Sequence, residues 1–267
     1  MPIARIAEWY VPVELNALKR QSELTIAQLA KKLGVSPRTI TNYLTGETRP
    51  KAGMAASYAR VCGASEKRMD FLSHVITQLD NGAIVSELSD RNIFIVELAE
   101  ATSGEIWKWE PLYVPGPLQI ELYHSGMLPG QERDPMQHYQ RKFRRYQTLS
   151  KRRPAPKTHY LVSGNALRIL DGWQWRDKQI ERLLEADGHP ECEVRVLEGL
   201  HYGMEHGFDI YLPDGRPGAP PPFVYVETLD QSRHIEEAFK VELYHDRVNH
   251  MWSSGTRIGR WLDDRSQ

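Results

Sequence analysis

The stretch TIAQLAKKLGVSPRTITNYLTG, residues 25–46, predicts two short helices joined by a tight turn. The apolar residues of the first helix recur at positions i, i+3, i+4 and i+7 and form one stripe: Ile26, Leu29, Ala30 and Leu33. Thr25 and Gln28 have the spacing of a capping box, which marks where this helix begins. Gly34 suits the left-handed conformation that ends it.

A second helix is predicted shortly after the first, because Ser36 is a favourable N-cap and Pro37 suits the first helical position. Ile40 and Leu44 are expected to face the core, and Gly46 ends the helix. The outer face is left small and polar. Two short helices with a glycine-containing turn and such a face indicate a helix-turn-helix unit.

The outer face of the second helix suits the major groove of DNA. Arginine bonds to the guanine edge and asparagine to the adenine edge, while threonine methyls meet the thymine methyl. The N-terminal part of such a helix enters the groove. The expected base-reading residues are Ser36, Pro37, Arg38, Thr39, Thr41 and Asn42. A plain helical hairpin with a solvated polar face is the alternative.

Arg49 and Lys51 follow the second helix and suit contacts to the DNA backbone, although solvated loop charges explain them equally well. Residues 1–80 hold 11 Lys and Arg against 7 Asp and Glu, a net charge of +4, while the whole chain carries −1. The remainder is therefore acidic. A basic amino-terminal part favours phosphate contact, and an acidic remainder is expected to work away from DNA.

The motif resembles the phage-repressor-like, or XRE-type, helix-turn-helix family, whose core reads approximately LAxxLGVSxxTIxxxxxGxxxP. The matching residues are Leu29, Ala30, Leu33, Gly34, Val35, Ser36, Thr39, Ile40, Gly46 and Pro50. Many members carry Gln directly after the cap of the first motif helix for a phosphate contact, where this chain has Ile26. Thr25 and Gln28 are expected to replace part of that contact.

Composition predicts an ordinary soluble globular protein. The chain has 267 residues, 40% hydrophobic and 26% charged, which is enough for two domains. No apolar run reaches membrane-span length, and MPIARIAEWY lacks the apolar core of a signal peptide, so we expect a cytoplasmic protein without membrane contact. Cys62 and Cys192 have no metal-binding spacing, which favours reduced thiols.

We predict an all-α, five-helix helix-turn-helix domain over 1–80, a linker over 81–92, and an α+β domain with one mixed sheet over 93–267. Helices of the first domain are expected over 14–22, 26–33, 37–45, 51–62 and 65–79. Strands or extended pieces of the second are expected over 105–116, 158–162, 192–198, 207–213 and 222–229. Its helices are expected over 93–100, 117–127, 134–149, 178–185, 239–252 and 256–262.

The segment VPGPLQIELYHSGML, residues 114–128, resembles the VPGLLQTxxYA segment of the C-terminal domain that follows an XRE helix-turn-helix in actinobacterial regulators, including WhiJ-related and antitoxin-like ones. RKFRRYQTL (141–149), the run 179–212 and FVYVETL (223–229) follow in that domain's order. The resemblance implies a small partner protein, often encoded nearby. The family often has Glu where Gly164 and Asn165 stand in this chain. The role of that carboxylate therefore cannot be assigned to this protein.

The segment RKFRRYQTLSKRRPAPK, residues 141–157, has eight Lys and Arg and no acid. A second phosphate-binding surface is one interpretation. A solvated helix end, or pairing with the acidic remainder, is the commoner explanation for such a run.

Chemistry in the second domain has little support in the sequence. His201, Glu205 and His206 are the best metal candidates, but their H-x-x-x-E-H spacing matches neither usual zinc-helix arrangement, so we expect no metal and no cofactor. Asp209, Glu227 and Glu236 would provide paired carboxylates for general acid–base catalysis only if the fold brings them close together. Without a nucleophile elbow, Walker loop or dinucleotide fingerprint, we do not expect an enzyme.

Tentative ligand or partner residues flank the VPG turn or lie in later strands and loops: Trp107, Trp109, Tyr113, Tyr123, His201, Tyr225 and Glu227. The aromatic residues suit a pocket or partner surface, with ordinary core packing as the alternative. The leading hypothesis is a sequence-specific transcriptional regulator that binds double-stranded DNA as a homodimer, since one short recognition helix contacts too few bases. The rival is a DNA-tethered sensor or enzyme with an active pocket in the second domain.

Overall fold

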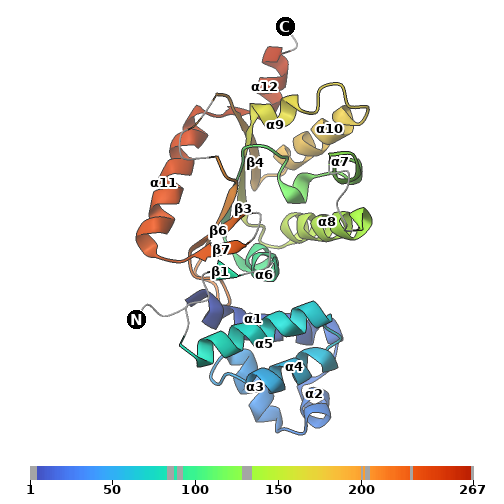
Figure 1. Cartoon of the computed structure of the whole chain (residues 1–267), viewed down its shortest axis with the longest axis vertical. Coiled ribbons are helices and arrows are strands. Elements are labelled where there is room, and N and C mark those ends of the chain that lie inside the picture. The colour runs from blue at the N-terminus through green and yellow to red at the C-terminus, as the bar shows by residue number, and fades with distance from the viewer. Residues whose placement is uncertain are drawn as a thin grey trace.

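The computed structural model describes residues 5–82, 87–88, 93–127, 134–199, 201, 205–228 and 231–265. Its first part is helical and lies at one end of the molecule (Figure 1). The helices are α1 (Arg5–Ser22), α2 (Ile26–Leu33), α3 (Pro37–Thr45), α4 (Ala52–Val61) and α5 (Glu66–Asp80). In these ranges no helix is long and apolar enough to cross a membrane.

The cap predictions for α2 and α3 are confirmed. Thr25 Oγ1 accepts from Gln28 N at 3.2 Å, and Gln28 Oε1 accepts from Thr25 N at 2.9 Å. Gly34 follows with φ 68°, in the left-handed region. Ser36 Oγ then accepts from Thr39 N at 3.1 Å, which starts α3. Local hydrogen bonds therefore fix the turn between the two motif helices.

Helix α1 begins at Arg5, well before the predicted start at residue 14. Pro12 lies inside it, and a proline in a helix interior normally argues for a break. Contacts of the early turns with the second part stabilise this segment: Ile6 N donates to Glu236 Oε2 at 2.8 Å, and Trp9 Nε1 donates to Gly218 O at 2.9 Å. Such long-range partners are invisible to sequence pattern.

The second part contains one mixed sheet, as predicted. Its strands in the described residues are β1 (Glu87–Leu88), β2 (Glu105–Glu110), β3 (Lys157–Ser163), β4 (Cys192–Leu197), β5 (Phe208–Leu212), β6 (Phe223–Glu227), β7 (Ser232–Ile235) and β8 (Thr256–Arg257). The spatial order is β1-β7-β6-β5-β2-β3-β4-β8. Strands β2, β3 and β4 pair in parallel, and the other neighbours pair antiparallel.

Helices cover both faces of this sheet (Figure 1). Helix α11 (Ala238–Ser254) lies on one face. The other face carries α7 (Glu121–Met127), α8 (Pro135–Lys151), α10 (Arg176–Asp187) and, nearest the helical part, α6 (Phe94–Thr102). Short α9 (Gly164–Arg168) and α12 (Ile258–Arg265) lie at the far end.

One predicted helix of this part is interrupted. The predicted helix over 117–127 is split into a 3-10 turn, η1 (Gly116–Leu118), and α7. Gln119 between them is extended, and its side chain donates to Val114 O at 2.7 Å. The predicted linker over 81–92 contains β1, which pairs with β7. A two-residue strand is too short to show an alternating pattern.

The helical part and the sheet share one hydrophobic core. A single cluster of buried side chains runs from Leu29 and Ile40 of the motif through Ile95 of α6 to Tyr211 and Phe223 of the sheet. Two further clusters fill the spaces under α8 and α10 and under α11. The helix-turn-helix unit is thus packed against the second part through α6, as well as being joined to it by the chain.

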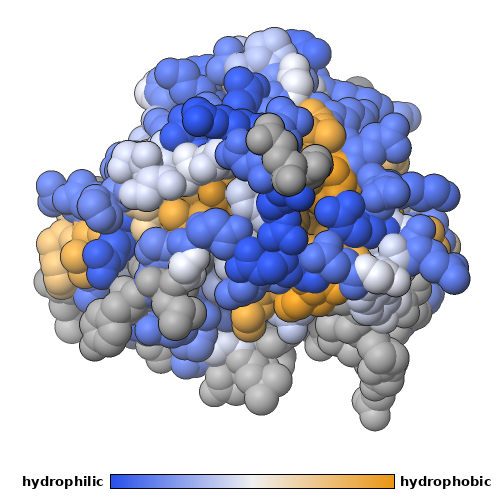
Figure 2. Space-filling view, turned by 90° about the horizontal axis from the view of Figure 1, so that it is seen from above, coloured by the Kyte–Doolittle hydropathy of each residue, from blue (hydrophilic) through white to orange (hydrophobic). Residues whose placement is uncertain are grey.

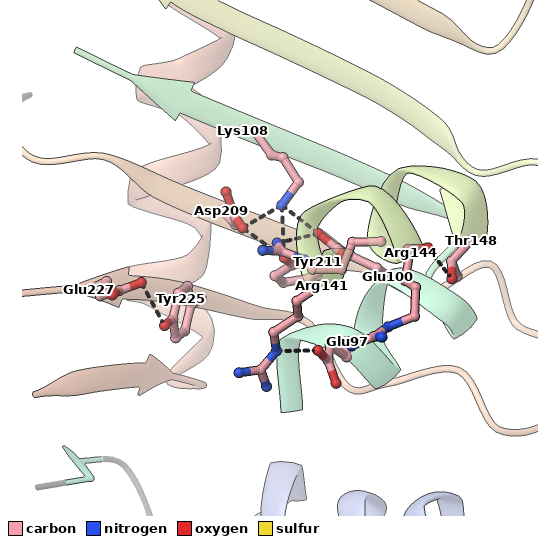
Figure 3. A network of polar contacts seen from close by, with 11 residues as sticks. Glu97, Glu100, Lys108, Arg141, Arg144, Thr148, Asp209, Tyr211, Tyr225 and Glu227 are labelled. Atoms are coloured by element: carbon pink, nitrogen blue, oxygen red, sulfur yellow. Dashed lines mark hydrogen bonds and ion pairs between the residues drawn. The ribbon is translucent and has the colours of Figure 1, made fainter. Parts of the chain in front are cut away.

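Next to this core a buried polar network connects α6, α8 and the sheet (Figure 3). Glu100 of α6 is 0% exposed and accepts two hydrogen bonds from Arg145 of α8, at 2.7 and 2.6 Å. Lys108 of β2, 2% exposed, lies 3.0 Å from Glu100 Oε1 and also contacts Asp209 and Tyr211 of β5. Burial alone raises the pKa of Glu100, but Arg145 and Lys108 outweigh burial and hold this pKa below its ordinary value.

Removing one cation from this network is expected to destabilise the fold. Arg145→Ala leaves the buried Glu100 carboxylate with Lys108 alone, and should lower the free energy of unfolding in urea by about 3 kcal/mol. Arg153→Ala is the matched control, because exposed Arg153 bonds to the backbone oxygens of Ser150 and Arg152. A change within about 0.5 kcal/mol for both variants would show that the network does not hold α6 in place.

His234 of β7 makes stability depend on pH. Its side chain is 0% exposed, and burial lowers its pKa from 6.5 to about 3. Below about pH 6.5 only the unfolded chain takes up this proton, so stability falls as pH falls. From pH 7.5 to 5.5 the loss from this residue should be about 1.4 kcal/mol, measured by urea unfolding at each pH.

His234→Leu removes the titrating group and should remove that part of the pH dependence. His250→Gln, at an exposed position of α11, should leave the profile unchanged. An identical slope in wild type and His234→Leu would contradict the assignment.

Candidate nucleic-acid interface

Helix α3 presents a polar face outward from a buried anchor. Ile40 is 0% exposed and fixes which side of the helix faces the core. Of the predicted base-reading residues, Ser36, Pro37, Arg38 and Thr41 are exposed, and Thr39 and Asn42 are half-buried. All six lie on the first turns of α3 or at its cap. This is the end of a recognition helix that enters the major groove.

The polar side chains of α3 differ in how free they are. Ser36 Oγ lies 2.9 Å from Thr39 Oγ1, and Thr41 Oγ1 donates to Pro37 O at 3.2 Å. With its amide turned to satisfy both partners, Asn42 donates to Arg38 O at 3.1 Å and to Glu47 Oε2 at 3.0 Å. Asn42 must therefore leave Glu47 to reach an adenine edge.

Arg38 is the best placed of the predicted base-reading residues. Its guanidinium is exposed and forms no ion pair with the residues that the structure describes. A free planar guanidinium suits the two acceptors of guanine.

The predicted phosphate-contacting residues are also at the surface, but three of the four already have partners within the protein. Thr25 and Gln28 are exposed and use the capping-box atoms on each other, which leaves the Gln28 amide N–H groups for a partner. Lys51 is exposed ahead of α4. Arg49 Nη2 instead lies 2.8 Å from Asp80 Oδ1 at the end of α5. Arg49 reaches a phosphate only after this ion pair opens.

Several residues of the basic segment 141–157 turn toward the protein. Arg141 Nε donates to Glu97 at 2.6 Å, and Arg145 binds Glu100 as described above. Lys142 donates to Gln119 Oε1, and Arg152 donates to backbone oxygens of Glu100 and Ser103. Figure 3 shows Arg141 reaching from α8 to Glu97 of α6. Four of the eight cations in this segment thus bond to the rest of the second part: Arg141 and Arg145 pair with acids, and Lys142 and Arg152 bond to neutral oxygens.

The tentative ligand residues lie in different parts of the fold, although Tyr225 and Glu227 contact each other. Trp107 and Trp109 alternate on β2 and pack under α11, at 5% and 3% exposure. Tyr123 is buried under α8 and α10, and Tyr225 belongs to the cluster shared with the helical part. Tyr113 is 44% exposed. These rings lie on opposite faces of the sheet, and the sequence alone does not show which face each one occupies.

The fold brings two of the polar candidates of the second part near each other. Asp209 of β5 pairs with Tyr225 of β6, and Glu227 lies on the same face two residues further on. His201 Nε2 lies 3.0 Å from Glu198 O, and Glu227 accepts from Tyr225 Oη at 3.1 Å. Residues 202–204, inside the HYGMEH segment, lie outside the described residues, and those that are described contain no group of three His, Cys, Asp or Glu suited to a metal. Asp209 contacts Lys108, whereas Glu236 binds Ile6 N near the start of the chain.

Two features of the second part were not predicted. One is the network of Glu100, Lys108 and Arg145. A charged residue at the centre of the apolar strand EIWKWE was the available signal for it. The other is a cavity of about 490 Å³ between the helical part and α6 and α8, lined by residues from both. Its walls are far apart in the sequence and carry no common motif.

Comparison with known proteins places the two parts in families. Residues 13–72 match the "Helix-turn-helix domain" model, and residues 96–257 match the "Domain of unknown function (DUF5753)" model. No curated protein matches the chain. Among solved structures, TrmBL2, an archaeal chromatin protein described as showing a novel mode of DNA binding, is 13% identical. The alignment covers 94% of this chain and 93% of that one with a TM-score of 0.32, too low to relate the two folds.

The DUF5753 match spans β2 through β8 and includes most of α6, so it covers more than half of the chain. The protein therefore belongs to the DUF5753 family and carries a helix-turn-helix domain ahead of that domain.

Proposed function

We propose that this protein is a sequence-specific DNA-binding transcriptional regulator that acts as a repressor. The observation that carries the proposal is the position of Arg38, exposed and free of an ion pair among the described residues, on the first turn of a helix held by Ile40 and capped by Ser36. The match of residues 13–72 to a helix-turn-helix domain supports the same function. We also propose that it is related to the XRE-type regulators and to the WhiJ-related, antitoxin-like ones.

Dimerisation and binding of a small partner protein, encoded nearby, are assigned to the second part. A homodimer doubles the number of bases read and so raises specificity. Phe239 and Leu243 support an interaction role for α11, because they are 68% and 65% exposed and lie one turn apart. Figure 2 shows hydrophobic surface at the left edge of the molecule, the side on which α11 lies in Figure 1.

A second function, small-molecule sensing, is favoured by the cavity of about 490 Å³ between the two parts. Enzyme activity is not part of the proposal. The charged groups nearest the centre of the sheet bind one another, as Lys108 binds Glu100 and Asp209, which supports a structural role for them.

The proposal is tested by gel-shift titration of the full-length protein against its own upstream DNA and a scrambled duplex at fixed salt. Arg38→Ala and Asn42→Ala should each weaken binding to the preferred duplex by about 1–3 kcal/mol and relax preference at one base position. Arg260→Ala, an exposed arginine on α12, is the control and should have no effect. Equal weakening on scrambled DNA would show that these side chains do not read bases.

The Arg49–Asp80 ion pair predicts a gain of DNA binding. Asp80→Asn removes the carboxylate that holds Arg49 at 2.8 Å, so Arg49 becomes free to contact a phosphate. Binding should strengthen on specific and scrambled duplexes alike. The slope of log affinity against log salt should steepen by about one unit.

Asp70→Asn is the matched control, because Asp70 is an exposed acid on the same helix α5. It changes the net charge equally without releasing Arg49. If Asp70→Asn reproduces the whole effect of Asp80→Asn, the gain comes from net charge and the assignment of Arg49 is wrong.

A further inference from the structure

We infer that the cavity between the helix-turn-helix part and the second part binds a small oxyanion, a metabolite bearing phosphate or carboxylate groups, and that this ligand controls DNA binding. The inference rests on the proposed DNA-binding function. The cavity measures about 490 Å³ and is lined by Gln21 and Arg68 from the first part and by Glu97, Glu100, Arg144 and Arg145 from the second. This volume lies within the range of small-ligand sites.

The acids in the cavity wall already have cationic partners. Glu97 accepts from Arg141 Nε at 2.6 Å. Glu100 is bound by Arg145 and Lys108 in the network of Figure 3. The carboxylates at this wall are therefore neutralised from the protein side and do not oppose an incoming anion.

The arginines in the wall have more hydrogen-bond donors than these acids occupy. Arg68 donates through Nε and Nη2 to buried Glu14, which leaves its Nη1 group for another acceptor. Arg144 is exposed and forms no ion pair with any residue in the described ranges. Figure 3 shows it on α8 beside Arg141 and above Glu97. A guanidinium fork matches the paired oxygens of a carboxylate or phosphate, so Arg144 is the principal anchor.

Neutral polar side chains complete the wall. Gln21 is exposed at the end of α1 and supplies an amide from the helix-turn-helix part. Thr148 supplies a hydroxyl from α8, where it bonds to Arg144 O at 3.0 Å. A ligand anchored on Arg144 would thus meet hydrogen-bonding groups from both parts of the protein.

The position of the cavity connects its occupant to the recognition helix. Phe94, at the start of α6, has Arg68 and Arg141 over its ring at 5.6 and 5.2 Å, so the two parts meet beside the cavity wall. Helix α1, which carries Gln21, is also bonded to α3, because Asn16 Nδ2 donates to Leu44 O at 2.7 Å. An anion that pulls α1 and α5 toward α8 would shift α3 relative to a second copy on DNA. Such coupling is reciprocal.

Isothermal titration calorimetry of the full-length protein tests the inference, with inorganic pyrophosphate and citrate as the probes. At least one probe should bind saturably with one site per chain. Arg144→Ala should weaken this binding at least tenfold, which is about 1.4 kcal/mol. Arg260→Ala, an exposed arginine at the opposite end of the molecule (Figure 1), should leave it unchanged. Because Arg144 has no ion pair in the described ranges, the thermal midpoint of the variant should equal that of wild type.

A second pair of variants tests whether the ligand also contacts the helix-turn-helix part. Gln21→Glu places a negative charge in the wall with little change of size and should weaken binding severalfold. Gln174→Glu, at an exposed turn position before α10 and outside the wall, should not. Loss of binding in Arg144→Ala but not in Gln21→Glu would overturn the two-part site.

The inference is overturned if neither probe binds saturably in the millimolar range, if binding survives Arg144→Ala, or if Arg260→Ala weakens it equally. Gel shifts with and without the probe distinguish failure of the anion site from failure of the proposed DNA-binding function. Specific DNA binding without any response to the probe would reject the regulatory site and leave the DNA-binding function intact. Probe binding without specific DNA binding would reject the proposed function and leave the anion site.

Discussion

The arrangement of this protein depends on one buried carboxylate. Glu100, with 0% exposure, is stable as an anion only because Arg145 of α8 and Lys108 of β2 both reach it. These contacts fix α6 between the sheet and α8. Because the helix-turn-helix helices pack on α6 through the shared core, the position of the helix-turn-helix unit depends on the same interaction.

Local signals were sufficient to predict the helix-turn-helix unit. Thr25, Gln28, Gly34 and Ser36 act within a few residues of themselves, so their cap geometry follows from sequence alone. The longer strands of the second part were also predictable from alternation. Their order was not, because β2 lies between β5 and β3, partners that are distant in the chain. Strands β1, β7 and β8 are too short to show a pattern.

Which polar residues lie on the outer face of α3 was likewise predictable, since they are neighbours in sequence. The pairing of Arg49 with Asp80 was not, because it joins residues separated by two helices. The junction cavity escaped prediction for the same reason, as Arg68 and Arg144 meet only in the fold. We propose that the first part reads DNA and that the second part, coupled to it through α6, sets how well it does so.

DNA reading by the first part is tested by selection of binding sites from a random duplex pool, using the full-length protein at near-physiological salt. We expect enrichment of a two-fold symmetric sequence whose half-sites lie about one helical turn, or a multiple of it, apart. The protein should bind this sequence roughly a thousandfold more tightly than the starting pool. Salt-sensitive binding that enriches no sequence would contradict it, because the exposed face of α3 would then contact phosphates without reading bases.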